Sequence, residues 1–144
     1  MTRSIVMERV FDYPPDRVWR ALTDSSALAD WLMENDFQPV LGHEFTFRTK
    51  PAPGFDGIVR CRVTVLDPPK ALAYTWASGD FETLVTWTLE PSGEGTRLRL
   101  EHSGFAGIKG FFLRMFLSGG WKRIVHVRLL ANLEGRSVPC HSHK

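Results

Sequence analysis

The 144-residue chain carries 18 Lys and Arg against 16 Asp and Glu, a formal net charge of +2, and 43% of its residues are hydrophobic. This balance is typical of a single globular domain with a substantial core, and it argues against nucleic acid as a partner. No apolar run approaches the roughly 20 residues of a membrane span, and two cysteines provide no disulfide framework. We therefore expect a reduced, cytoplasmic protein without a membrane span.

The first part of the chain predicts one strand followed by two short helices. Residues 5–11 are apolar and β-branched, which is typical of a strand. Pro15 followed by Asp16 favours a helix start, and Ser25 is expected to cap a second helix that carries Trp31. The acidic residues that come near the second helix are expected to lie in a solvated loop, and they are Asp30, Glu34 and Asp36.

From Gly42 onward, apolar residues recur at every second position in five stretches separated by turn-forming residues. This pattern predicts an antiparallel meander, and with the first strand the sheet has six strands. One face is expected to be apolar and to carry Phe45, Phe47, Val59, Cys61, Val63, Val65, Leu72, Tyr74, Trp76, Thr83, Val85, Trp87, Leu89, Leu98, Leu100 and His102. The other face carries Arg48, Arg60, Arg62, Arg97, Arg99 and Glu101.

Residues 121–134 predict a long helix that covers the apolar face of the sheet. Gly119 and Gly120 are expected to form a flexible start, and Gly135 is a suitable residue to end the helix. The apolar residues of this stretch recur at helical spacing and are Trp121, Ile124, Val125, Val127, Leu129, Leu130 and Leu133.

Residues 106–118 form an apolar segment directly before that helix, and two interpretations of it remain open. It is either a short helix that completes the core or a mobile lid hinged by glycines. We expect a single domain over 1–135 and a disordered tail over 136–144.

Several short motifs together carry a resemblance to a known family. They are Arg9–Phe11, Val18–Asp24, Trp31, Gly42–Phe45, Gly57, Leu72–Trp76, Val85–Leu89, Gly95–Thr96, Leu98, Leu100, His102–Phe105 and Gly120–Trp121. The chain resembles the START and birch-pollen-allergen superfamily, also called SRPBCC, and within it the family named after the activator of heat shock protein 90 ATPase homologue.

This resemblance implies an α+β helix-grip fold, in which a curved antiparallel six-stranded sheet wraps around a long C-terminal helix, with two short helices after the first strand. It also implies a cavity between sheet and helix for an apolar small molecule. The superfamily hosts lipid carriers, hormone receptors, aromatase/cyclases and co-chaperone domains, so the resemblance does not imply one reaction.

We expect the ligand-binding side chains, called the interior set below, to line the space between sheet and helix. They are Trp31, Phe45, Phe47, Tyr74, Trp76, Val85, Trp87, His102, Phe112, Trp121 and Val125. His102 and Tyr74 are also candidate catalytic groups, although a core histidine hydrogen-bonded to the backbone at the strand end is the favoured interpretation of His102.

No other chemistry is indicated by the sequence. Ser103 follows His102 directly and so faces the opposite side of its strand, which excludes a nucleophile–base pair. The metal-binding residue types Cys140, His141 and His143 cluster only in the tail, so we expect neither a metal nor a cofactor.

Three hypotheses follow. The first is binding of a small lipophilic or aromatic molecule without catalysis. The second is a cyclase-like or hydrolytic enzyme that acts on an apolar substrate with His102 as acid or base. The third is a chaperone-associated interaction domain whose basic outer face contacts an acidic protein, through Arg60, Arg62, Arg97 and Arg99. A homodimer remains open.

Overall fold

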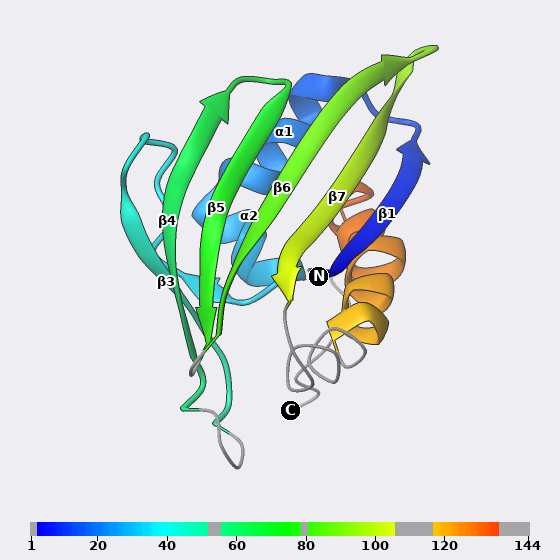
Figure 1. Ribbon diagram of the computed structural model, residues 1–144. Helices are drawn as coiled ribbons and strands as arrows, with labels where there is room; N and C mark the ends of the chain where they lie inside the picture. The colour runs from blue at the N-terminus through cyan, green and yellow to red at the C-terminus, as the bar shows by residue number, and fades with distance from the viewer. Residues whose placement is uncertain (1–2, 52–55, 79–80, 106–116, 136–144) are drawn as a thin grey trace.

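A computed structural model of the chain describes residues 3–51, 56–78, 81–105 and 117–135. In these residues one antiparallel sheet is covered on one face by helices (Figure 1). The strands are β1 (Arg3–Phe11), β2 (Glu34–Asn35), β3 (Glu44–Arg48), β4 (Ile58–Asp67), β5 (Ala71–Ser78), β6 (Phe81–Ser92) and β7 (Gly95–Phe105), and the helices are α1 (Pro15–Thr23), α2 (Ser25–Trp31), the π-helical turn η1 (Ile124–Leu129) and α4 (Leu130–Leu133). This is the predicted helix-grip fold.

Within the described residues the sheet has seven strands in the order β1-β7-β6-β5-β4-β3-β2, one more than predicted. The additional strand is β2, where Glu34 pairs with Arg48 and Asn35 with Phe47. This stretch was expected to be a solvated loop, because two residues are too few to show an alternating pattern. Asp36 beside it accepts a hydrogen bond from the backbone N–H of Thr46 at 2.7 Å, so the acidic stretch is tied to β3.

One strand departs from the predicted alternation. The register between β4 and β5 shifts between Val63 and Val65, so a bulge interrupts the ladder there. Val63 is buried as expected, whereas Val65 is 43% exposed instead of facing the core. The prediction for Val65 was therefore wrong, because one inserted residue reverses the facing of every later side chain.

The two short helices are joined at Asp24. Its carboxylate accepts the N–H of Ala27 at 3.2 Å, so Asp24, and not Ser25, caps α2. The Ser25 hydroxyl instead donates to the side-chain oxygen of Asn35 at 2.8 Å and thereby holds α2 against β2. Trp31, at the end of α2, donates its indole N–H to the carbonyl of Ala21 at 2.8 Å, which fixes the two helices to each other.

The C-terminal helix is continuous from residue 117 to 133, so Gly119 and Gly120 lie inside it and are not a flexible start. Gly135 follows with a φ of +79°, and the helix ends as predicted. Four of its buried residues are spaced four apart: Trp121, Val125, Leu129 and Leu133. In a straight α-helix this spacing drifts by about 40° at each step. The wider turn of η1 offsets the drift, and all four side chains stay buried.

Two arginines connect this helix to the rest of the molecule. The Arg17 guanidinium of α1 donates to the carbonyls of Asn132 (3.2 Å) and Leu133 (3.0 Å) in the last turn. On β1, Arg9 donates to the carbonyl of His126 at 2.8 Å. The C-terminal helix is thus tied to an edge strand at its middle and to α1 at its end.

The first and last strands along the chain, β1 and β7, lie side by side in the sheet (Figure 1). A β-carbon on Gly95 would collide with the carbonyl oxygen of Phe11, so only glycine permits the close approach of β7 to β1. Beside it, the Thr96 hydroxyl donates to the carbonyl of Tyr13 at 2.7 Å, across 83 positions of sequence.

Candidate functional site

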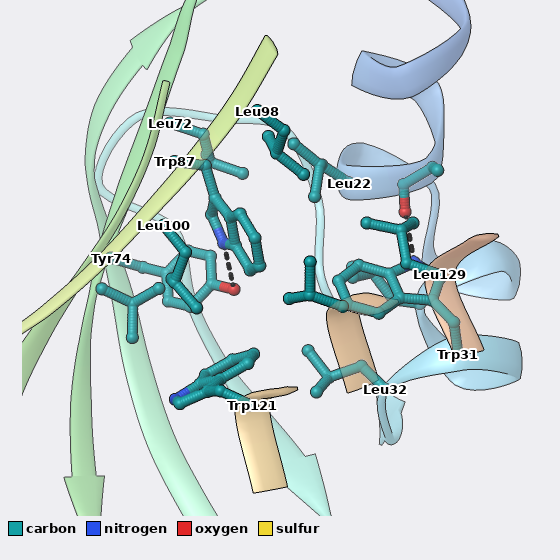
Figure 2. Close-up of a cluster of buried hydrophobic side chains, with 14 of the residues drawn as sticks. Leu22, Trp31, Leu32, Leu72, Tyr74, Trp87, Leu98, Leu100, Trp121 and Leu129 are labelled. Atoms are coloured by element: carbon teal, nitrogen blue, oxygen red, sulfur yellow. Dashed lines mark hydrogen bonds between the residues drawn. The ribbon is translucent and has the colours of Figure 1, made fainter. Parts of the chain in front are cut away.

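The interior set gathers on the covered face of the sheet. Ten of its eleven members are described, and each is at most 6% exposed. Phe112 lies outside the described residues, as does nearly all of the segment for which a lid or a short helix was expected. In Figure 2, Trp31 from α2, Tyr74 and Trp87 from the sheet and Trp121 from the C-terminal helix point toward one another.

The rings of the interior set contact one another directly. Trp87 lies 5.9 Å from Trp31 and 5.7 Å from Trp121 between ring centroids, both edge to face. The ring centroid of Trp76 lies 5.6 Å from that of Trp121 and 5.6 Å from that of Phe47. Each such pair adds about 0.5–1.5 kcal/mol beyond area burial. A ligand between sheet and helix therefore needs these rings to move apart.

Two hollows of the surface lie outside this cluster. One, of about 380 Å³, lies beside η1, and the other, of about 520 Å³, lies over β3, β4 and β5. Phe45 is the one described member of the interior set that lines either of them. Neither hollow reaches the Trp31, Trp87 and Trp121 rings.

Tyr74 is a buried hydroxyl with half of its hydrogen-bonding capacity in use. Its oxygen accepts the indole N–H of Trp87 at 3.0 Å (Figure 2). Within the described part of the chain, the hydroxyl hydrogen of Tyr74 is not donated to any acceptor. Burial raises the pKa of Tyr74, so the group stays a neutral donor.

His102 stands in a chain of hydrogen bonds. Trp121 donates its indole N–H to Nδ1 of His102 at 3.0 Å, and Nε2 lies 2.7 Å from the Thr83 hydroxyl. Since Nδ1 accepts, the proton is on Nε2, which donates to Thr83, and Thr83 in turn donates to the carbonyl of Trp76 at 3.2 Å. Each hydrogen thus has an acceptor, and the hydrogen-bond chain joins the helix to the three strands β7, β6 and β5.

This arrangement requires a neutral imidazole. Burial lowers the pKa of His102 to about 3, and a proton on Nδ1 would face the Trp121 N–H. No hydrogen bond joins His102 to Tyr74 among the described residues. The contacts account for His102 as a core group, but its partners are the side chains of Thr83 and Trp121 and not the expected backbone groups. Acid–base work would require His102 to give up a hydrogen bond at each ring nitrogen. Thr83 is the partner that sequence reasoning did not single out, although a threonine on an apolar face was a signal.

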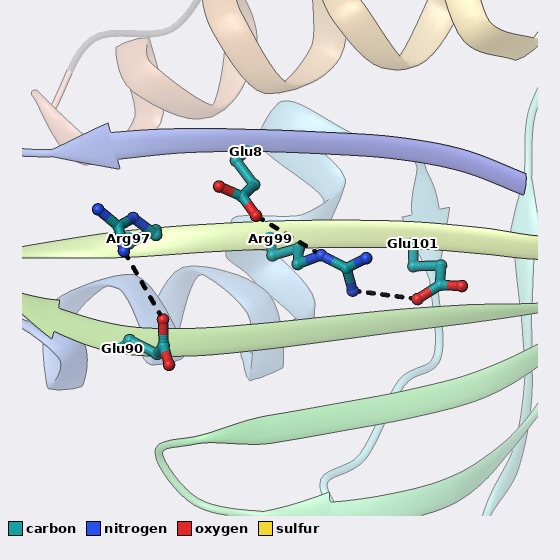
Figure 3. A network of polar contacts seen from close by, with 5 residues as sticks. All are labelled: Glu8, Glu90, Arg97, Arg99 and Glu101. Carbon is teal, nitrogen blue, oxygen red and sulfur yellow. Dashed lines mark hydrogen bonds and ion pairs between the residues drawn. The ribbon is translucent and has the colours of Figure 1, made fainter.

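The outer face of the sheet is charged but balanced. Arg99 lies between Glu8 at 3.6 Å and Glu101 at 3.0 Å, and Arg97 lies 4.0 Å from Glu90 (Figure 3). Arg60 lies 3.7 Å from Asp56. Three of the four arginines proposed to contact an acidic partner therefore have carboxylates on their own chain, which reduces the positive potential of this face.

The remaining candidate chemistry is sparse in the described residues. They contain no group of three or more His, Cys, Asp and Glu side chains placed to hold a metal ion. Cys61 is a buried free thiol, and burial raises its pKa. No helix among the described ranges is long and apolar enough to cross a membrane.

Comparison with known proteins identifies the family. A family profile described as "Activator of Hsp90 ATPase homolog 1-like protein" matches residues 12–134. The chain belongs to this family. The predicted family is thus confirmed, on a match that covers most of the chain.

Solved structures agree with this assignment to the Hsp90 ATPase activator-like family. Protein MLL2253 from Mesorhizobium loti is 34% identical with a TM-score of 0.85, over 94% of this chain and 100% of that one. Protein BH1534 from Bacillus halodurans is 28% identical with a TM-score of 0.77, over 92% and 99%. Among curated proteins, none matches this chain significantly in sequence.

A third similar structure shares the fold. The Aha1 protein from Colwellia psychrerythraea, described as a dimer, is 22% identical with a TM-score of 0.76, over 92% of this chain and 96% of that one. At this identity the likeness shows the fold alone.

Proposed function

We propose that this protein binds a small, largely apolar molecule between the sheet and the C-terminal helix, and that Tyr74 donates a hydrogen bond to it. The observation that carries the proposal is the hydroxyl hydrogen of Tyr74, which has no acceptor in the described part of the chain although the side chain is 1% exposed. A buried polar group left unmet costs about 1–3 kcal/mol. A ligand acceptor would remove that cost.

The surroundings of Tyr74 define the ligand class. The ring centroids of Phe45 and Phe47 lie 5.4 and 5.9 Å from that of Tyr74, and the Trp87 indole N–H binds the Tyr74 hydroxyl oxygen. Such walls favour a flat ring system that carries one carbonyl or ether oxygen. Because the rings fill the site, the measured affinity is lowered by the fraction of molecules in which they have moved apart.

The test uses two rings of the same shape, fluorenone, which has a carbonyl, and fluorene, which lacks one. We expect both to raise the melting temperature of the protein, because each binds only the folded state. Fluorenone is expected to bind more tightly, by about tenfold for a hydrogen bond worth about 1.4 kcal/mol. Calorimetric titration measures the ratio, and native mass spectrometry of freshly purified protein reports any molecule already bound.

Two variants separate the hydroxyl from the ring packing. Tyr74→Phe removes the donor and is expected to abolish the preference for fluorenone. Trp87→Phe removes the indole N–H and some volume but keeps the Tyr74 hydroxyl, so the preference should persist while both affinities change together. If neither compound binds the wild-type protein and purified protein carries no small molecule, the proposed function is wrong.

A further inference from the structure

The hollow beside η1 is separate from the interior set and has its own chemistry. Its volume is about 380 Å³, which is within the usual range of small-molecule sites. It lies between the end of α2, the β2–β3 edge of the sheet and η1. Its lining residues are Leu32, Met33, Glu34, Arg48, Thr49, Lys50 and Arg128.

The lining is positively charged. It contains three cationic side chains, Arg48, Lys50 and Arg128, against one carboxylate, Glu34. Glu34 and Arg48 are paired in the β2–β3 register, yet no ion pair joins Arg48 or Lys50 to a carboxylate within the described residues. Together with the Thr46 backbone N–H, Arg48 is nevertheless close enough to Asp36 to help lower the pKa of that carboxyl.

Arg128 gives a second, independent indication. One of its terminal nitrogens donates to the carbonyl of Asp30 over a long 3.4 Å. Its Nε is buried and has no hydrogen-bond partner, and it is the one side-chain atom of the described residues in that condition. A guanidinium with an unmet donor beside a hollow is a favourable place for an anion, since its planar fork fits carboxylate and phosphate oxygens.

The other side of the hollow is hydrocarbon. Leu32 extends into the buried cluster and is 3% exposed (Figure 2), and Met33 beside it is half-buried against the core. A free inorganic anion would leave the exposed part of the Met33 side chain in contact with water. An anion attached to an apolar body would contact both sides of the hollow.

We propose that this hollow binds the anionic head of a small amphipathic molecule, a carboxylate or phosphate group on an apolar body. Arg48, Lys50 and Arg128 supply the positive charge, and Leu32 and Met33 contact the adjoining hydrocarbon. No member of the interior set lines the hollow, so this site does not depend on the proposed binding between sheet and helix.

The experiment titrates the full chain with octanoate, octyl phosphate and the neutral octanol, and follows backbone amide shifts by NMR. Octanoate is expected to shift the amides of Met33, Thr49 and Arg128 and to bind at least about tenfold more tightly than octanol, because charge-assisted hydrogen bonds form with the head alone. Added salt should weaken octanoate and leave octanol unchanged. Octyl phosphate is expected to shift the same amides. Whichever of the two anions binds with the higher affinity identifies the preferred head group, carboxylate or phosphate.

Matched double variants test the location. Arg48→Gln with Lys50→Gln changes two exposed side chains and should weaken octanoate about tenfold or more. Arg20→Gln with Arg123→Gln makes the same change in net charge at exposed positions outside the hollow and should leave binding unchanged. Tyr74→Phe should also leave octanoate binding unchanged.

Three results would overturn the inference. They are equal binding of octanoate and octanol, equal weakening in both double variants, and the absence of shifts at the hollow at millimolar octanoate. Each of these leaves the fluorenone experiment untouched, so the two proposals fail or stand separately.

Discussion

His102 shows how a titratable residue becomes part of a core. Its two ring nitrogens connect the indole N–H of Trp121 to the Thr83 hydroxyl, and the Trp76 and Phe105 rings lie 5.3 and 4.7 Å away. Apolar burial disfavours the charged form of the ring, and the Trp121 donor fixes which nitrogen stays bare. The neutral side chain is therefore a condition of folding.

Stability should consequently fall as the pH is lowered. The pKa of His102 is about 3 when folded and about 6.5 when unfolded, so below pH 6.5 the unfolded chain takes up a proton that the folded chain refuses. The linkage amounts to about 2 kcal/mol at pH 5. Urea unfolding at pH 7 and pH 5 should show wild type losing about that much more than His102→Gln, in which the other titrating groups are the same. Equal losses in the two proteins would show that His102 does not titrate on unfolding.

Tyr74 and His102 also show what could be predicted of the candidate site. Alternation along β5 and β7 correctly predicts that both are buried on the covered face, because strand geometry sets the facing of a side chain. The contact between His102 and Thr83 could not be predicted, because it depends on how β6 and β7 are aligned. The close contact among the rings was equally hidden, since it depends on the distance between sheet and helix.

At the scale of the elements, the C-terminal helix is tied by arginines at its end and its middle, and by the buried Trp121 near its start. Arg17 donates to two carbonyls of the last turn, Leu133 and Asn132, and the Asn132 carbonyl also accepts the N–H of Gly135. A cation at this end also opposes the partial negative charge of the helix. The π-helical turn η1 interrupts the α-helical hydrogen bonds of this helix. The hydrogen bonds from Arg17 to its last turn therefore matter more than they would for a regular α-helix.

Arg17→Ala should therefore lower the free energy of unfolding by about 1–2 kcal/mol, the range of a charge-assisted hydrogen bond to partly buried carbonyls. Arg20→Ala is the matched control, because it removes the same charge from the exposed side of the same helix. Urea midpoints at constant m-value measure both. A similar loss in the two variants would mean that the charge of α1, and not the hydrogen bonds from Arg17, is responsible.

The elements differ in how well the sequence predicts them. Long alternating stretches such as β6 and β7 are predictable, because each inward apolar residue repeats the signal. β2 has no such repetition, and the bulge after Val63 depends on the partner strand. η1 follows from the four-residue spacing of Trp121, Val125 and Leu129 only when the helix is known to lie flat on the sheet.

For the whole molecule, the strand order shows which strand pairs are close in sequence and which are distant in sequence. β4, β5, β6 and β7 each pair with the strand that precedes or follows them in the chain. β1, in contrast, pairs with β7, which is the last strand in the chain. Loop-closure entropy disfavours the second kind of contact until the rest is formed. We therefore expect the β5–β6 region to form before the β1–β7 pair.

Folding kinetics test this order with two core truncations. Leu72→Ala in β5 is expected to cost about 3 kcal/mol and to slow folding, whereas Ile5→Val in β1, which is expected to cost about 1 kcal/mol, should mainly speed unfolding. Stopped-flow fluorescence in urea provides both limbs of the chevron. A larger effect on the folding rate from Ile5→Val, relative to its change in stability, would reverse the proposed order.

The pairing of β1 with β7 also has a consequence during synthesis on the ribosome. β1 is translated before the other strands of this sheet, yet the strand that completes its hydrogen bonds is translated about 90 residues later, and Ile5 and Phe11 lack that neighbour until then. The nascent chain thus carries an unpaired, apolar strand for most of its elongation. A pause in translation before β7 prolongs that exposure.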